Sequence, residues 1–333
     1  MARLYIAFFF LFSAIAVPAQ ILPTFGNSRT GTAGMQFLKA GIDARSMAMS
    51  GAVVAITSDP SSMFWNPAGI AQADTLSFNI QSSAASYYSK TRLNQAGVIY
   101  HKRKSQTFWG INLISLSTGR MKETTEFQPT GTGRTFAFSD LLAGITYSRV
   151  LTDNFCFGVS GKYVNESVAG VQLHNVLFDL GLHYNVKIRN TRFAAVVSNF
   201  GVNVKPGGSV QILKFIGPTD ITEFEEISAP SVFRVGVASD VFRSNDQGMV
   251  ASLQLNHPTD NNETLSLGFE YMWKSIFFCR SGFEFGADEG GFPAFGFGVK
   301  LPRRFGNLRL DYGMNNKKYL GTVNRVSLAF GLK

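Results

Sequence analysis

The chain has 333 residues, of which 16% are charged, below the roughly 25% of ordinary soluble domains. Its formal net charge is +9, but the basic residues gather at predicted turns and not along one stripe, so we expect no nucleic-acid partner. Two cysteines, Cys156 and Cys279, exclude a disulfide framework, and their predicted strand positions face opposite sides of a wall.

Residues 1–19 have the layout of a cleavable signal peptide. One charge at Arg3 precedes an apolar run from Leu4 to Val17, and small residues at Val17 and Ala19 suit a cleavage site. A retained membrane helix is the alternative, but the run is shorter than the roughly 20 residues that such a helix needs. We therefore expect an exported protein whose mature chain begins at Gln20.

Residues 20–73 are too apolar for a disordered tail and too few to form a core alone. In "DPSSMFWNPAGIA", Asp59 before Pro60 predicts a helix N-cap with proline at the first helical position, and Pro67 predicts the end of that helix. We expect a plug, or hatch, that packs inside a barrel. Its predicted site residues are Asp59, Met63, Phe64, Trp65, Asn66, Pro67 and Ala68.

Residues 74–333 fall into short segments in which apolar residues alternate with polar or small ones, as in strands with two different faces. In "ETLSLGFEYMW", for example, Leu265, Leu267 and Phe269 share one face, and Ser266 and Glu270 share the other. The segments number about fourteen, an even count that suits a closed bacterial barrel. We therefore predict an all-β fold, a transmembrane antiparallel β-barrel.

A soluble sandwich would also alternate, but the charges on the polar face favour a polar lumen surrounded by lipid. Those charges are Arg234, Asp240, Glu270, Arg280, Glu284, Arg309 and Asp311. The connections also alternate in length. Short ones are predicted at 103–105, 151–154, 189–191, 243–247, 274–275 and 303–306, and long ones at 119–135, 205–229, 257–263 and 314–321. We expect both termini at the periplasmic side and the long loops outside the cell.

The loop 205–229 carries an unusual load of apolar residues for an exposed connection. It either folds inward over its own barrel mouth or forms a lip that receives an apolar ligand or a partner. The predicted binding residues are Ile212, Leu213, Phe215, Ile216 and Glu225, with Phe127 in the loop across from them.

No pattern in the sequence indicates chemistry. His183 shares the lumen face with Asp179, but no nucleophile signature accompanies the pair, and a structural histidine is expected. Histidine and cysteine do not cluster at metal-ligand spacing. We expect no catalysis, no metal and no cofactor.

Several motifs resemble the PorV/PorQ family of Bacteroidota outer-membrane proteins. They are "GTAGMQFLKAGIDARSMAMSGAVVAITSDPSSMFWNPAGIA", "TGTGRTFAFSDLLAGITYSRVLTDNFCFGVSGKYV", "FDLGLHY", "VSNFG" and "LQLNHPTDNNETLSLGFEY", and together they extend over nearly the whole mature chain. The triplet Asn66-Pro67-Ala68 is similar to the hatch motif of the related FadL fatty-acid transporters. The resemblance implies a FadL-type fourteen-stranded barrel with a hatch, in a Gram-negative outer membrane, that works with the type IX secretion system. PorV-like members bind the C-terminal signal domain of secreted cargo.

Two functions of different classes follow. The leading hypothesis is a PorV-like component of type IX secretion that binds cargo proteins or the translocon through its extracellular loops. The alternative is a FadL-like transporter of hydrophobic small molecules. A barrel that only stabilises a larger complex is a third possibility. Besides a partner or ligand, outer-membrane lipid is an expected contact in every case.

Overall fold

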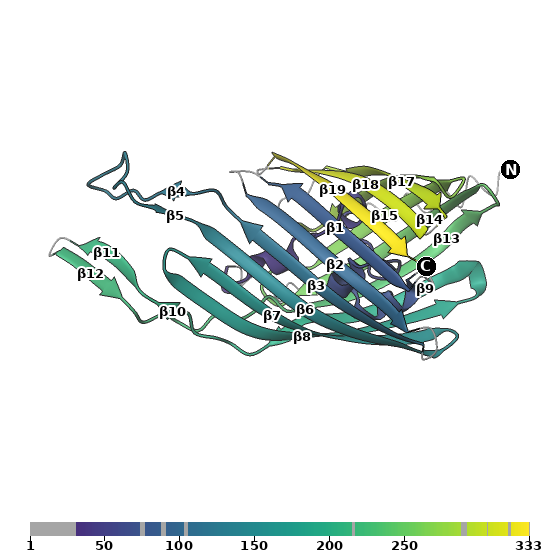
Figure 1. Cartoon of the computed structure of the whole chain (residues 1–333), viewed down its shortest axis with the longest axis horizontal. Coiled ribbons are helices and arrows are strands. Elements are labelled where there is room, and N and C mark those ends of the chain that lie inside the picture. The colour runs from purple at the N-terminus through teal and green to yellow at the C-terminus, as the bar shows by residue number, and fades with distance from the viewer. Residues whose placement is uncertain are drawn as a thin grey trace, which may run out of the picture.

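The computed structural model describes residues 31–73, 77–87, 91–102, 106–214, 217–287, 292–304, 306–318 and 321–332. The predicted signal peptide, residues 1–19, lies outside them. Within the described part, fourteen long antiparallel strands form a closed barrel, because the first strand pairs with both the second and the last (Figure 1). The prediction of an all-β barrel of about fourteen strands is confirmed.

The wall strands pair with their neighbours in chain order. They are β1 (Phe78–Ser86), β2 (Arg92–Lys102), β3 (Thr107–Ser117), β6 (Phe138–Thr152), β7 (Phe155–Val168), β8 (Val171–Val186), β9 (Thr191–Gly201), β13 (Val232–Arg243), β14 (Gln247–Pro258), β15 (Thr264–Trp273), β16 (Phe277–Phe285), β17 (Ala294–Arg303), β18 (Gly306–Lys317) and β19 (Gly321–Leu332).

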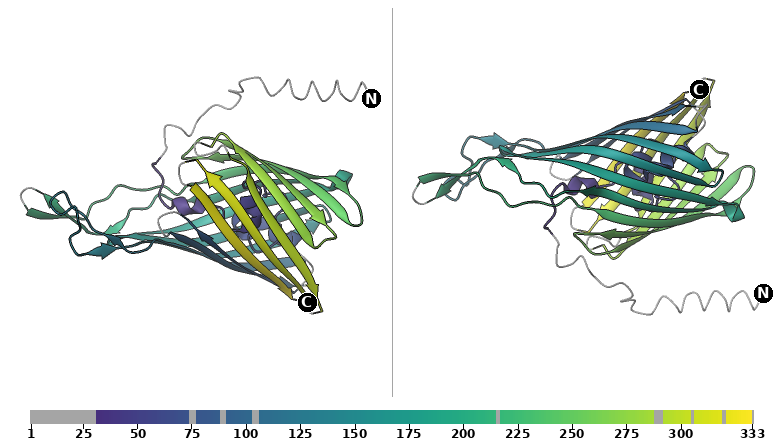
Figure 2. Two further views of the ribbon diagram at one scale, coloured as in Figure 1. Left: turned by 90° about the horizontal axis from the view of Figure 1, so that it is seen from above. Right: turned by 90° about the horizontal axis from the view of Figure 1, so that it is seen from below.

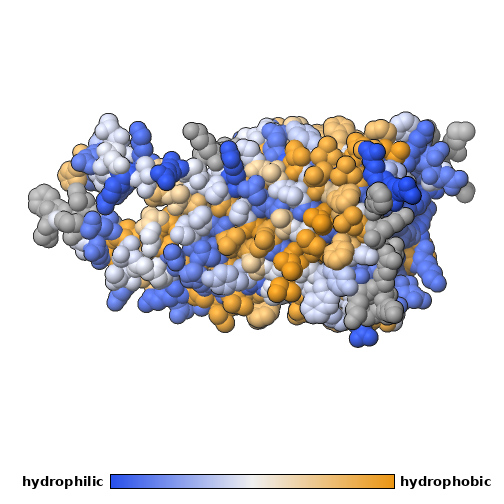
Figure 3. All heavy atoms as spheres, viewed as in Figure 1, coloured by the Kyte–Doolittle hydropathy of each residue, from blue (hydrophilic) through white to orange (hydrophobic). Residues whose placement is uncertain are grey.

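The two faces of the wall differ as the alternation predicts. On β8, Phe178 and Leu180 are 51% and 58% exposed, whereas Asp179 between them is fully buried in the interior. Cys156 is buried and Cys279 is exposed, in agreement with their predicted faces. Figure 3 shows apolar residues gathered over the wall strands and polar residues toward both ends. This arrangement is that of an integral outer-membrane barrel.

Two long connections leave one end of the barrel and project beyond the wall as an extension that we call the arm (Figures 1 and 2). The described part of the arm consists of residues 118–137, 202–214 and 217–226, and residues 227–231 lead back into the barrel, where Ala229 is buried. It contains the short strands β4 (Met121–Lys122), β5 (Thr135–Phe136), β10 (Gly207–Gly208), β11 (Val210–Lys214) and β12 (Gly217–Ile221). We call this end of the barrel the arm end.

The predicted long connection at 314–321 is wrong. Strands β18 and β19 stay paired as far as Lys317 and Gly321, so the connection is short. Asn315 and Asn316 read as loop residues because they are polar, but their backbones hydrogen-bond in a ladder as those of apolar residues do. The connections at the arm end therefore differ greatly in length.

The segment 31–73 lies inside the barrel (Figure 2). It forms η3 (Gln36–Lys39), α2 (Ala44–Ala48), α3 (Ser62–Trp65) and η4 (Pro67–Gln72). Outside this segment, the short helical turn η6 (Ile188–Asn190) connects the wall strands β8 and β9. Wall glycines make room for this interior segment, since a Cβ at Gly158 would overlap the backbone of Pro67 and one at Gly282 that of Met49. None of the described helices is long and apolar enough to cross a membrane.

Candidate functional site

The helix around Met63 begins later than predicted. The Asp59 Oδ1 atom accepts a hydrogen bond from the Ser61 backbone N–H at 3.1 Å, which makes a local turn, and α3 begins at Ser62. This is the bond that an N-cap residue makes to the second residue of a helix, so the predicted capping by Asp59 is present, but Pro60 and Ser61 form a turn and not the first helical residues.

Asn66 begins a new helical turn after α3 ends. Its Oδ1 accepts from the Ala68 backbone N–H at 3.0 Å, and Pro67 occupies the first position of η4. Pro67 therefore starts a second turn as well as following the first, which the sequence analysis did not predict. The Asn66 Nδ2 group donates to the backbone carbonyls of Val54 and of Leu182 in β8, at 3.0 and 3.3 Å. The triplet Asn66-Pro67-Ala68 is thus fixed to the barrel wall.

The three apolar residues of the predicted hatch are buried in different directions. Met63 packs on Gly110 of β3. The Phe64 and Trp65 rings meet edge to face, 5.2 Å apart. The Trp65 Nε1 group donates to Asp43 Oδ1 at 3.1 Å, and the Arg234 guanidinium lies 5.5 Å from the Trp65 ring centre.

One side of the lumen holds a buried charge cluster. Arg45 of α2 donates two hydrogen bonds to Glu270 of β15, at 2.8 and 2.9 Å. Arg280 of β16 bridges Glu270 and Asp311 of β18 at 2.6 and 2.8 Å, and Arg309 joins Asp311 at 2.6 Å. Burial alone would lower the pKa of Arg45, but Glu270 raises it above its ordinary value. The cluster ties the interior segment to three strands through charge-assisted bonds.

The opposite side of the lumen is apolar toward the arm end. We call its buried residues the apolar strip: Leu93, Ile114, Leu142, Val164, Leu173 and Leu177, from β2, β3, β6, β7 and β8. Met35, Phe37 and Leu38, in and next to η3, belong to the same hydrophobic cluster and cover it. The strip was not predicted, although the sequence contains a signal for it in pairs of adjacent apolar residues. In Leu141–Leu142 and Leu177–Phe178, one residue faces lipid and its neighbour faces the lumen.

The backbone ladder of the wall is interrupted beside the end of this strip, although the Asn175 Nδ2 group donates to the Val202 carbonyl across the interruption at 3.0 Å. A bulge shifts the register between β8 and β9, where Asn199 has φ of 59° and donates its backbone N–H to Asp179 Oδ1 at 2.8 Å. Beyond Leu177, the described part of β9 offers no partner to residues 173–176 of β8, and β10 pairs with residues 171 and 172. We call residues 173–176, with the facing residues 201–206, the wall break.

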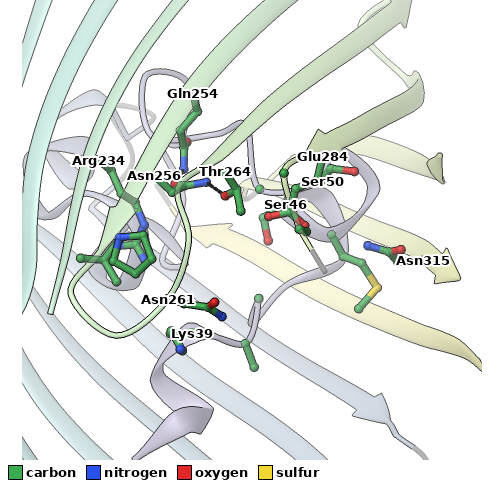
Figure 4. Close-up of a pocket in the computed structure, with 18 of the residues that line it drawn as sticks. Lys39, Ser46, Ser50, Arg234, Gln254, Asn256, Asn261, Thr264, Glu284 and Asn315 are labelled. Carbon is green, nitrogen blue, oxygen red and sulfur yellow. Dashed lines mark hydrogen bonds between the residues drawn. The ribbon is translucent and has the colours of Figure 1, made fainter. Parts of the chain in front are cut away.

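A cavity of about 480 Å³ opens at the arm end, and we call it the mouth cavity (Figure 4). Its lining is mixed: polar side chains, among them Lys39, Arg234, Gln254, Asn261, Glu284 and Asn315, alternate with apolar surface from Met47, Trp65, Val232 and Val323, and the apolar part of the surface is the larger. Among the predicted site residues that the structure describes, Trp65 alone lines it.

The predicted loop residues whose side chains are described do not line this cavity. Phe127 is 67% exposed on the arm, and Glu225 is exposed as well. The structure describes the backbone of Ile212 and Leu213, in β11, but not their side chains. Phe215 and Ile216 are not among the described residues. Ile227 of the same loop packs inward against the hydrophobic cluster of the lumen.

Among the described residues, His183 and Asp179 do not form a catalytic pair. The His183 Nε2 atom is 3.1 Å from the carbonyl of Ala55, and Asp179 pairs with Lys162, so each contributes to packing of the interior. No group of three or more potential metal ligands occurs among the described residues.

No protein-family model matches the chain, and no curated protein matches it. Its fold is similar to that of solved outer-membrane proteins. The CymD monoaromatic hydrocarbon channel has a TM-score of 0.60 and 12% identity, over 88% of this chain and 98% of that one. The Ralstonia pickettii toluene transporter TbuX has 0.59 and 14%, over 87% and 97%. A Pseudomonas aeruginosa FadL homologue has 0.51 and 9%, over 88% and 98%. At these identities the likeness establishes a FadL-like barrel fold.

Proposed function

We propose that the protein is an outer-membrane conduit for small hydrophobic molecules. The observation that carries this proposal is the apolar strip, which leads from the arm end to the wall break. An apolar molecule moving along the strip stays out of water, and a gap in a barrel wall offers it a lateral exit into lipid. The similar hydrocarbon and toluene channels support this reading over secretion.

In this proposal the arm end faces outside the cell, the end of β19 lies at the periplasmic side, and the interior segment is the hatch. The described chain begins at the arm end, because Ala33 pairs with Ser228, which follows the arm, so the predicted periplasmic N-terminus is not supported.

The two parts of the hatch are held differently. The Met35 backbone N–H bonds Glu166, and Gln36 and Lys39 both bond Asp260 at 2.9 Å, so η3 has few polar anchors. Residues 44–73 are fixed by the charge cluster and by Asn66. Displacement of η3 alone would uncover the strip while the triplet Asn66-Pro67-Ala68 stays in place as a floor.

A small apolar fluorophore, 1-aminoanthracene, tests the conduit on the full barrel held in amphipol. We expect saturable fluorescence that toluene competes away. Leu177→Asn should weaken binding about tenfold, since it places a polar group on the strip. Leu180→Asn, on the lipid face of the same strand, is the matched control and should leave binding unchanged.

Asp260→Asn should tighten binding, because it removes the ion pair that holds Lys39 and frees η3 to move. Absence of saturable binding, or equal effects of the two leucine substitutions, would overturn the conduit.

The arm favours a second candidate, a PorV-like partner protein of type IX secretion. A conduit for small molecules does not require an arm that projects so far beyond the wall (Figure 1), whereas a surface for secreted cargo or for a translocon does. Replacing residues 212–216 with an equally long Gly/Ser segment should reduce recovery of cargo with the tagged protein from its native membrane. Unchanged recovery from a barrel that retains its heat-modifiable mobility would count against this role.

A further inference from the structure

Two buried arginines lie at or just behind the lining of the mouth cavity, and neither has a carboxylate within ion-pair distance among the described residues, although the charge of Asp179 acts on Arg234 from farther away. Arg234 of β13 lines the cavity, is 4% exposed and donates from Nη1 to the Ser198 hydroxyl at 2.8 Å. Arg325 of β19 is 1% exposed and donates to the Tyr87 hydroxyl at 2.8 Å, just behind the lining. Neither guanidinium forms an ion pair within the described part of the chain.

The other charges at the cavity are balanced. Lys39 pairs with Asp260 at 2.9 Å, and Lys317 with Glu284 at 3.6 Å. Among the lining residues the excess is therefore the charge of Arg234, while Arg325 and the buried carboxyl group of Asp43, which bonds the lining residues Ser46 and Trp65, both lie behind the lining. A buried charge without a counter-ion is costly, so an anion that enters the cavity would relieve that cost.

Arg234 keeps hydrogen-bonding capacity for such an anion. Its Nε and Nη2 groups make no hydrogen bond to the described residues, and in Figure 4 its side chain lies with Asn261 and Lys39 around one space. The Nε and Nη2 N–H groups point the same way from one planar guanidinium, which is the geometry that binds a carboxylate with two parallel bonds.

Neutral polar groups surround the rest of the space. Gln254 and Asn256 are held in place by bonds to each other and to Thr264, at 2.7 and 3.0 Å. The side-chain amide of Asn315 makes no hydrogen bond to the described residues, and the buried Asn262 Oδ1 atom has no partner among them. Such free amides, which both donate and accept, match a ligand rich in hydroxyl groups. A hydrocarbon would leave them unsatisfied.

We propose that the mouth cavity binds a small acidic sugar, with its carboxylate on Arg234 and its hydroxyls on the asparagines. The volume of about 480 Å³ lies within the range of small-molecule sites and is large enough for a monosaccharide or disaccharide. This site shares no residue with the apolar strip, so its test does not depend on the proposed conduit.

Isothermal titration of the full barrel in detergent tests the site with three probes: D-glucuronate, D-glucose and hexanoate. We expect D-glucuronate to bind at least about tenfold more tightly than either of the others, because it alone carries both the carboxylate and the hydroxyls. Equal binding of D-glucose would overturn the role of the arginines. Equal or tighter binding of hexanoate would overturn the role of the amides.

Substitutions then locate the carboxylate. Arg234→Gln should weaken D-glucuronate about tenfold or more and leave weak D-glucose binding unchanged. Arg243→Gln, an exposed arginine near the other end of the same strand, is the matched control and should have no effect. If Arg234→Gln does not give a heat-modifiable barrel, Asn315→Ala provides a milder test, with an expected loss of about threefold. Unchanged D-glucuronate binding in a folded variant would overturn the proposal.

Discussion

The two sides of the lumen hold the interior segment by different physics. On the side of β15 to β18, the charge cluster fixes α2 through directional bonds that break when either partner moves. On the side of β2 to β8, apolar contacts cover the strip, and such contacts are non-directional. One side can therefore specify the position of a segment, while the other lets part of it slide. Three substitutions sharpen this comparison.

The largest effect is expected at the charge cluster. Glu270→Gln leaves Arg45 and Arg280 buried with one carboxylate fewer, at a cost of about 3–5 kcal/mol in stability. The midpoint of the heat-induced mobility shift should fall, and amide exchange should rise in residues 44–48. Arg243→Met removes a charge that is mostly exposed and serves as the control. A midpoint equal to that of the control would show that the cluster does not hold the segment.

Truncation of the strip should cost less and act elsewhere. Leu142→Ala removes buried methyl groups at a cost of about 2–3 kcal/mol. Because the strip contacts η3, amide exchange should rise in residues 36–39 and stay unchanged in residues 44–48. The same truncation at Leu141, on the lipid face, is the control. Equal loosening of both parts by Leu142→Ala would mean that the segment moves as one body.

The smallest effect is expected at Asn66. Asn66→Ala removes the cap of η4 and the bond to β8, at a cost of about 1 kcal/mol from the cap. Exchange should rise in residues 67–72 without a change of the η3 signal. Asn66→Asp keeps the capping oxygen but loses the donor to Leu182, so it separates the two contributions. If both variants match the parent, the triplet does not anchor the floor.

Local patterns were sufficient to predict the wall but not what fills it. The alternation around Asp179 assigns each residue of a strand to lipid or lumen without knowledge of distant residues. Arg45 and Glu270 are 225 positions apart, and no local pattern joins them. The adjacent apolar pairs are a local signal for the apolar strip. The expectation of a uniformly polar lumen leaves no place for an apolar residue on the inner face, so this signal was not used.

The predicted helix and loop show the same limit at a smaller scale. Asp59 and Pro60 fit a helix start, yet the aspartate bonds Ser61 and a turn forms first. Asn315 and Asn316 have loop composition, yet they continue a strand because their neighbours across the ladder do. Composition indicates which secondary structure each residue favours. The hydrogen-bond partners that the fold offers to its backbone determine which secondary structure forms.

The position of the interior segment also constrains how the protein is made. The Ala44 backbone N–H bonds Ser327 of the last strand, 283 residues away, and the same strand closes the barrel by pairing with β1. Contacts between such distant residues form late, because closing so long a loop costs entropy that earlier contacts must offset. We expect residues 31–73 to settle on the growing sheet before the seam between β1 and β19 forms. The segment then acts as a template during assembly. The strands pack around it, and its size determines the diameter at which β1 and β19 pair.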